Sequence, residues 1–70
     1  MNTMFQVDDY FVRIKDYGGR LKLAVWTHTG EKVVSEFISA ATLPQVWSHI
    51  EKMSSSNVVG AVKAKLSGES

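Results

Sequence analysis

The sequence predicts an α+β domain, in which an antiparallel β-meander of three to four strands is followed by one or two C-terminal helices packed on one face. Up to about residue 38, apolar and polar residues alternate with a period of two between glycine-containing turns. After Thr42 the apolar residues recur at helical spacing instead. A chain of 70 residues, 44% hydrophobic and 21% charged, suits one small globular fold, so residues 1–70 are expected to form a single domain.

The first two strands are expected on either side of an acidic turn. Residues 4–7 form a short apolar run, and the pair Asp8-Asp9 that follows is typical of turns. Residues 10–15 then alternate as a half-buried strand does. One side of this strand should carry Tyr10, Val12 and Ile14, and the other Phe11, Arg13 and Lys15.

The next strand should follow a tight hairpin turn. Gly18-Gly19 supplies adjacent residues that reach positive φ without steric cost, as such turns require. Residues 20–28 show the clearest alternation in the chain. One face should carry Leu21, Leu23, Val25 and Thr27, and the other Arg20, Lys22, Ala24, Trp26 and His28.

A further strand is expected over residues 31–38, after a turn at Thr29-Gly30. Alternation leaves two registers open. The register that buries Val34 would also bury Glu36, and an unpaired buried carboxylate is costly. The preferred inward set is therefore Val33, Ser35 and Phe37, which sends Lys32, Val34 and Glu36 outward.

Two helices are expected after the strands. Thr42 is a suitable N-cap and Pro44 is tolerated in a first turn, so a helix is predicted over residues 43–53. Its apolar side, including a core tryptophan, would carry Leu43, Val46, Trp47, Ile50 and Met53. Residues 58–66 fit a second helix capped by Ser56 or Asn57, but Val62, Ala64 and Leu66 also alternate as in a strand. The helix is preferred.

Composition argues against several classes of protein. The chain has no cysteine, so disulfides and thiolate zinc sites are excluded, which suits a cytoplasmic location. Two distant histidines do not supply a metal site, and we expect neither metal nor cofactor. Asp8 and Asp9 stand where a secretory signal would be apolar, and no uncharged stretch is long enough to cross a membrane. We therefore expect no membrane association.

No catalytic constellation is visible. Neither His28 nor His49 has a nucleophile or carboxylate that the pattern places beside it, and both are expected to be solvated. Gly18-Gly19 lacks the flanking glycines and lysine of a phosphate-binding loop. The sequence predicts a protein that is not an enzyme.

The informative feature is the sheet face turned away from the helices. If the strands pair through their short turns, this face gathers aromatic and basic side chains that have no obvious place in the core. Such a combination suits a protein–protein hot spot or base stacking. The predicted partner-binding residues are Phe11, Arg13, Lys15, Lys22, Trp26, His28, Lys32 and Glu36.

The stretch YGGRLKLAVWTHTGEKVVSEFISAATLPQVW combines these elements in a suggestive order. A glycine turn precedes a basic-apolar strand, and a second glycine turn precedes a strand ending in Phe37 and a helix that opens on Thr42 and carries Trp47. In this order of features the chain resembles the first-described family of phage type I-F anti-CRISPR proteins. SNVVGAVKAKL would match the second helix of that family. The resemblance is one of pattern, with few identities outside these positions.

The resemblance implies a stoichiometric inhibitor in the cytoplasm of an infected bacterium. Its sheet would grip the backbone subunit of a Cascade-type surveillance complex and block hybridisation of target DNA to the guide. The family's contact tyrosines and sheet acid do not carry over, because Ile14 or Lys15 and Trp26 stand near their places. Two alternatives stay open: a small single-stranded nucleic-acid-binding protein with Trp26 and Phe11 as stacking platforms, and a structural homo-oligomer that packs sheet on sheet.

Overall fold

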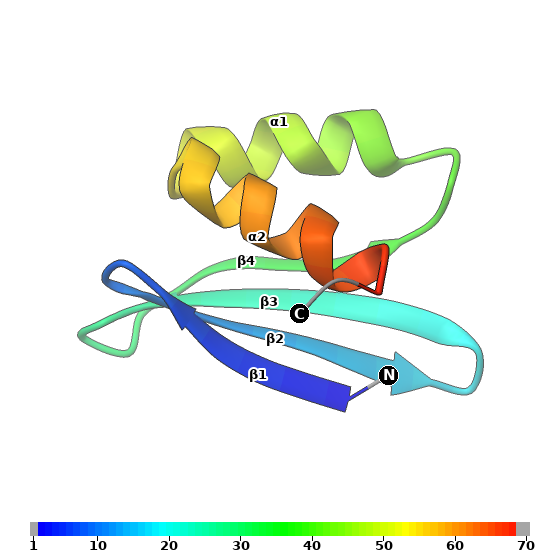
Figure 1. Ribbon diagram of the computed structural model, residues 1–70, viewed down its shortest axis with the longest axis horizontal. Helices are drawn as coiled ribbons and strands as arrows, with labels where there is room; N and C mark the ends of the chain where they lie inside the picture. The colour runs from blue at the N-terminus through cyan, green and yellow to red at the C-terminus, as the bar shows by residue number, and fades with distance from the viewer. Residues whose placement is uncertain (1, 69–70) are drawn as a thin grey trace.

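A four-stranded antiparallel sheet carries two helices on one face in the computed structural model, which describes residues 2–68. The strands follow one another across the sheet in chain order: β1 (Asn2–Val7), β2 (Tyr10–Tyr17), β3 (Arg20–Thr27) and β4 (Lys32–Ile38). The helices are α1 (Leu43–Met53) and α2 (Ser56–Leu66). Figure 1 shows both helices above the sheet and the other sheet face uncovered. The predicted meander with C-terminal helices is confirmed, and residues 58–66 are helical.

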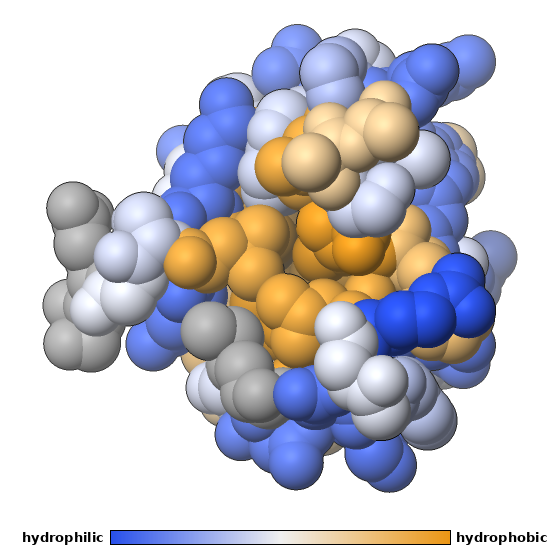
Figure 2. Space-filling view, turned by 90° about the vertical axis from the view of Figure 1, so that its right-hand side faces the viewer, coloured by the Kyte–Doolittle hydropathy of each residue, from blue (hydrophilic) through white to orange (hydrophobic). Residues whose placement is uncertain are grey.

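The core lies between the sheet and the helices. Branched aliphatic side chains from both layers are almost completely buried there: Val12, Ile14, Leu23, Val25, Val34, Val46, Ile50, Val58, Val59 and Val62. Seen from one end, apolar side chains fill the space between the two layers, and hydrophilic ones surround them (Figure 2). Each such side chain stabilises the fold by about 1.5–3 kcal/mol when fully buried. The inward faces predicted for β2 and β3 are therefore correct.

The β2–β3 hairpin closes through two glycines. Gly18 and Gly19 have φ of +63° and +91°, as both central residues of a type I′ turn require. The backbone N–H of Gly19 also donates a hydrogen bond to Oδ1 of Asp16, at 2.8 Å. The turn sets the pairing of Tyr17 with Arg20 and so the register of both strands.

Substitution of two glycines should shift stability in opposite directions. Gly19→Val forces a β-branched residue to positive φ and should cost at least about 1–2 kcal/mol. Gly60 lies within α2 and a Cβ there would meet no atom within 4 Å, so Gly60→Ala should stabilise by about 0.5–1 kcal/mol. Thermal melts of both variants check this. Equal melting temperatures would contradict the assigned turn.

The register of β4 differs from the prediction. Val25 pairs with Val34, but Trp26 pairs with Lys32, so Val33 is an extra residue in a β-bulge. The bulge keeps Lys32 on the uncovered face, as predicted, while it turns Val34 and Glu36 towards the helices. Ser35 and Phe37 consequently lie on the uncovered face, so their predicted inward position is wrong, whereas Val33 in the bulge is partly buried against the core, as predicted.

α1 has the predicted boundaries, whereas α2 begins at Ser56, two residues before the predicted helix, and the capping residues differ from the prediction. Thr42 precedes α1 without a side-chain cap, because its hydroxyl bonds to Ser39 instead. The Ser55 side chain, not Ser56 or Asn57, caps α2 by accepting a hydrogen bond from the backbone N–H of Val58. Trp47 is half-buried at the margin of the core, not central to it as predicted.

Candidate binding face

The uncovered side of the sheet is hereafter the open face. Strand pairing places alternate residues of all four strands on it. These residues are Asn2, Met4, Gln6, Phe11, Arg13, Lys15, Tyr17, Arg20, Lys22, Ala24, Trp26, Lys32, Ser35 and Phe37. The helices hold the opposite side of the sheet fixed, so the open face is presented on a packed scaffold.

The open face carries positive charge only. Its strand positions include five basic residues and no carboxylate: Arg13, Lys15, Arg20, Lys22 and Lys32. The acidic residues of the described chain lie in turns, on the helices or on the other side of the sheet. A chain with a formal net charge of only +1 therefore concentrates positive potential on one surface.

One aromatic cluster is centred on Trp26. The guanidinium carbon of Arg13 lies 5.1 Å from the Trp26 ring centroid, and the Lys32 ammonium lies 5.4 Å from it. Both distances are typical of cation–π contacts. Phe11 is the cross-strand partner of Trp26 on β2. A shallow hollow runs beside this cluster, lined by Met4, Phe11, Arg13, Trp26, Thr27, His28 and Gly30.

A second aromatic cluster is centred on Phe37. The guanidinium carbon of Arg20 lies 4.1 Å from its ring centroid and the Lys22 ammonium 5.4 Å from it. Tyr17 meets Phe37 edge to face, with ring centroids 6.1 Å apart. The Lys15 ammonium lies 5.1 Å from the Tyr17 ring. The open face thus has two aromatic clusters, each flanked by basic side chains.

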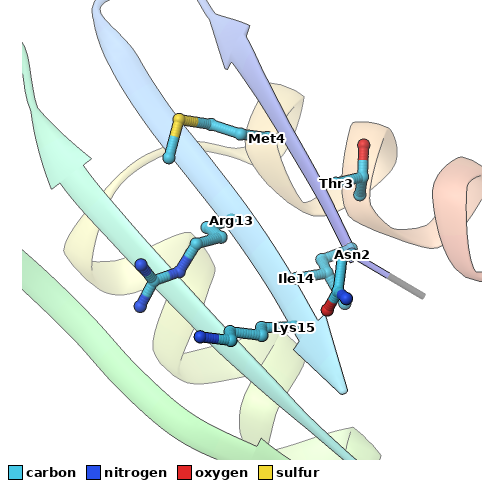
Figure 3. A pocket seen from close by; sticks show the side chains of 6 residues that line it. All are labelled: Asn2, Thr3, Met4, Arg13, Ile14 and Lys15. Atoms are coloured by element: carbon cyan, nitrogen blue, oxygen red, sulfur yellow. The ribbon is translucent and has the colours of Figure 1, made fainter.

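Basic side chains also lie between β1 and the middle of the sheet. Figure 3 shows the Arg13 and Lys15 side chains leaving β2 side by side and extending across β3, with Met4 on β1 beside them. These residues line a second shallow hollow together with Asn2, Thr3 and Ile14. At the centre, Ala24 is buried although it faces away from the helices, since the long neighbouring side chains cover it. The hollow is open, so it offers a surface for an extended ligand instead of an enclosed cavity.

Most of the predicted site residues lie together on the open face, but two do not. Glu36 belongs to the opposite side of the sheet, where its Oε1 lies 2.5 Å from Nδ1 of His49 on α1. Glu36 was predicted to face outward because a buried carboxylate without a partner is costly. Because β4 is an edge strand, the side chain is one-third exposed and has a partner, so that cost is small. His49, expected to be solvated alone, is that partner.

His28 also departs from the prediction. β3 ends at Thr27, and His28 lies in the following turn, on the rim of the hollow beside Trp26. It is exposed and does not belong to the paired positions of the open face.

The predicted site left out three aromatic or basic residues of the open face. Tyr17 and Arg20 extend the alternation of their strands to the hairpin turn, a signal that was present in the sequence. Phe37 was missed because the bulge at Val33 gives no clear local signal and reverses the side on which the rest of β4 lies.

The described residues offer little for metal chemistry. Within residues 2–68, no group of three or more His, Asp or Glu side chains is arranged to hold a metal ion. Neither α1 nor α2 has the length and apolar character of a membrane-crossing helix. The side chains of the open face can form ion pairs with anions and can stack on aromatic ligands.

Comparisons of the chain with protein-family models, with curated proteins and with solved structures found no match. Function is therefore inferred from the chemistry of the open face. The resemblance to the anti-CRISPR family stays a prediction.

Proposed function

We propose that the protein binds single-stranded nucleic acid through the open face. One observation carries the proposal: five basic residues and four aromatic rings lie together on one sheet face, and the paired positions of that face hold no carboxylate. A single strand presents a phosphate and an aromatic base at every step. The open face presents a complementary group for each of them.

The aromatic rings favour a single strand over a duplex. Base stacking on an aromatic side chain contributes about 1–3 kcal/mol per base, but only an unstacked base exposes its ring for this contact. Phe11 and Phe37 are 38% and 39% exposed, so their rings are accessible on the folded protein. The phosphates of a duplex would contact the basic side chains of the open face, but its paired nucleobases would not stack on the aromatic rings.

The same charges make sheet-on-sheet packing of two copies unfavourable. Two open faces brought together would place five basic residues against five others without carboxylates between them. Like charges at close range repel, and partial burial would increase this cost. The structural homo-oligomer is therefore the weakest of the three functions considered.

Inhibition of a type I CRISPR surveillance complex is the second candidate. It is favoured by one observation: an antiparallel sheet backed by two helices, with its other face uncovered, is the architecture that the resemblance implies. The aromatic and arginine residues of the open face would then act as hot-spot residues against a protein partner. A fold alone does not determine function, so this candidate rests on the resemblance.

Salt dependence tests the nucleic-acid proposal. We assume that four of the five basic residues neutralise phosphates of a labelled oligothymidylate or oligouridylate. A plot of the logarithm of affinity against the logarithm of salt concentration should then have a slope of about −3. Fluorescence anisotropy measures it. No binding to either oligonucleotide at low salt would overturn the proposal. Stoichiometric binding to a purified type I-F complex in that case would support the inhibitor function instead.

A further inference from the structure

The basic residues and aromatic rings of the open face form two similar groups, which are the aromatic clusters centred on Trp26 and Phe37. Arg13 and Lys32 lie over the Trp26 ring, and Arg20 and Lys22 lie over the Phe37 ring. Each group therefore combines one aromatic ring with two cations. A single nucleotide with its two flanking phosphates needs the same combination: one surface for stacking and two positive charges.

The strand register fixes how far apart the groups lie. Trp26 pairs with Lys32 and Phe37 pairs with Lys22, which is four residues from Trp26 along β3. At about 3.3 Å per residue, the two groups are separated by about 13 Å along the sheet. At about 3.4 Å per nucleotide step, this distance corresponds to about four steps and therefore to about five nucleotides, and a dinucleotide does not span it.

The surface between the groups suits a backbone that passes from one to the other. Lys15 and Lys22 pair across β2 and β3, beside Ala24, which the long side chains of its neighbours cover. Lys22 belongs to the Phe37 group, and Lys15 beside it can contact an intervening phosphate. The positive charge of the open face is thus continuous from one aromatic group to the other.

We infer that Trp26 and Phe37 form two base-stacking stations, which a single strand of about five or more nucleotides occupies together. This inference rests on the proposed function, and specifies it: the ligand is a short single strand bound at two points. The second contact is intramolecular once the first has formed, so a strand that spans both stations gains affinity without any new kind of contact.

A length series of oligonucleotides tests the inference. Oligothymidylates and oligouridylates of two, four, six and eight nucleotides are titrated against the protein at fixed low salt, and the two sugar types show whether the ligand is DNA or RNA. Affinity should rise by at least about tenfold between two and six nucleotides and more slowly from six to eight. Phe37→Ala should remove this step, while affinity for the dinucleotide falls by less than about threefold.

Folding of the variant is checked separately. Phe37 is 39% exposed on the open face, so Phe37→Ala should remain folded; Phe37→Leu, which keeps apolar bulk without an aromatic ring, serves as the second variant. Binding of wild type without a length step, or an unchanged step in Phe37→Leu, would overturn the two-station inference. Failure of wild type to bind any single strand would instead overturn the proposed function, so the two failures are distinguishable.

Discussion

Reversal of two charges at the centre of the open face should abolish binding of single-stranded nucleic acid. In Arg13→Glu/Lys22→Glu, two phosphate contacts are lost and two carboxylates are placed against the strand. Each phosphate contact contributes about 0.7 decade of affinity at 0.1 M salt, so loss of two contacts and repulsion at both positions should lower affinity by at least about 100-fold. Anisotropy with a six-nucleotide strand measures the loss.

A matched control keeps the same net charge. Lys52→Glu/Lys63→Glu reverses two exposed lysines on α1 and α2, and both double variants change the formal charge from +1 to −3. Exposed charges more than about 10 Å away are largely screened at 0.1 M salt, so the helical variant should bind within a few-fold of wild type. Equal losses in the two variants would mean that net charge, and not the open face, governs binding.

Loss of one core side chain from α1 should destabilise the protein most. Ile50 is completely buried between α1 and the sheet, and truncation of a buried isoleucine to alanine costs about 2–5 kcal/mol. For a domain of this size, the melting temperature should fall by at least about 8 °C. Thermal denaturation followed by circular dichroism measures this change.

Met53 supplies the comparison. It lies on the same helix and is 41% exposed, so Met53→Ala should cost less than about 1 kcal/mol. If the two variants melted at the same temperature, α1 would not pack on the sheet through Ile50.

The sequence predicts most of the fold because its local signals agree with one another. Gly18 and Gly19 allow a hairpin turn, and alternation on either side puts apolar residues on the face that the helices cover. The change to helical spacing after Thr42 and the position of Pro44 locate α1 to the residue. Local signals of this kind depend on neighbours in the chain, so a single sequence contains them.

The register of β4 could not be predicted in the same way. It depends on a bulge at Val33, where two residues face one on β3, and on the contact between Glu36 and His49 on a helix 13 positions away. Both are tertiary features. The burial cost assigned to Glu36 was sound for a central strand but not for an edge strand beneath a helix with a polar partner.

That one error removed part of the site from the prediction. With β4 reversed, Phe37 counted as a core residue and the cluster around it could not be recognised, although Tyr17, Arg20 and Lys22 already faced the same side. The placement of Phe11, Arg13 and Trp26 on one face was predicted correctly, since β2 and β3 alternate without interruption, and their role in binding stays a prediction.

The two tryptophans allow the most direct test of the open face as a binding surface. Trp26 lies on the open face, and Trp47 lies on α1 at the margin of the core. Trp26→Ala should lower affinity for a six-nucleotide single strand by at least about tenfold, because one stacked base is lost, with a small change in melting temperature. Trp47→Ala should lower the melting temperature more and leave affinity within about twofold. Unchanged binding by a folded Trp26→Ala, or a larger loss of binding in Trp47→Ala, would contradict the assignment of function to the open face.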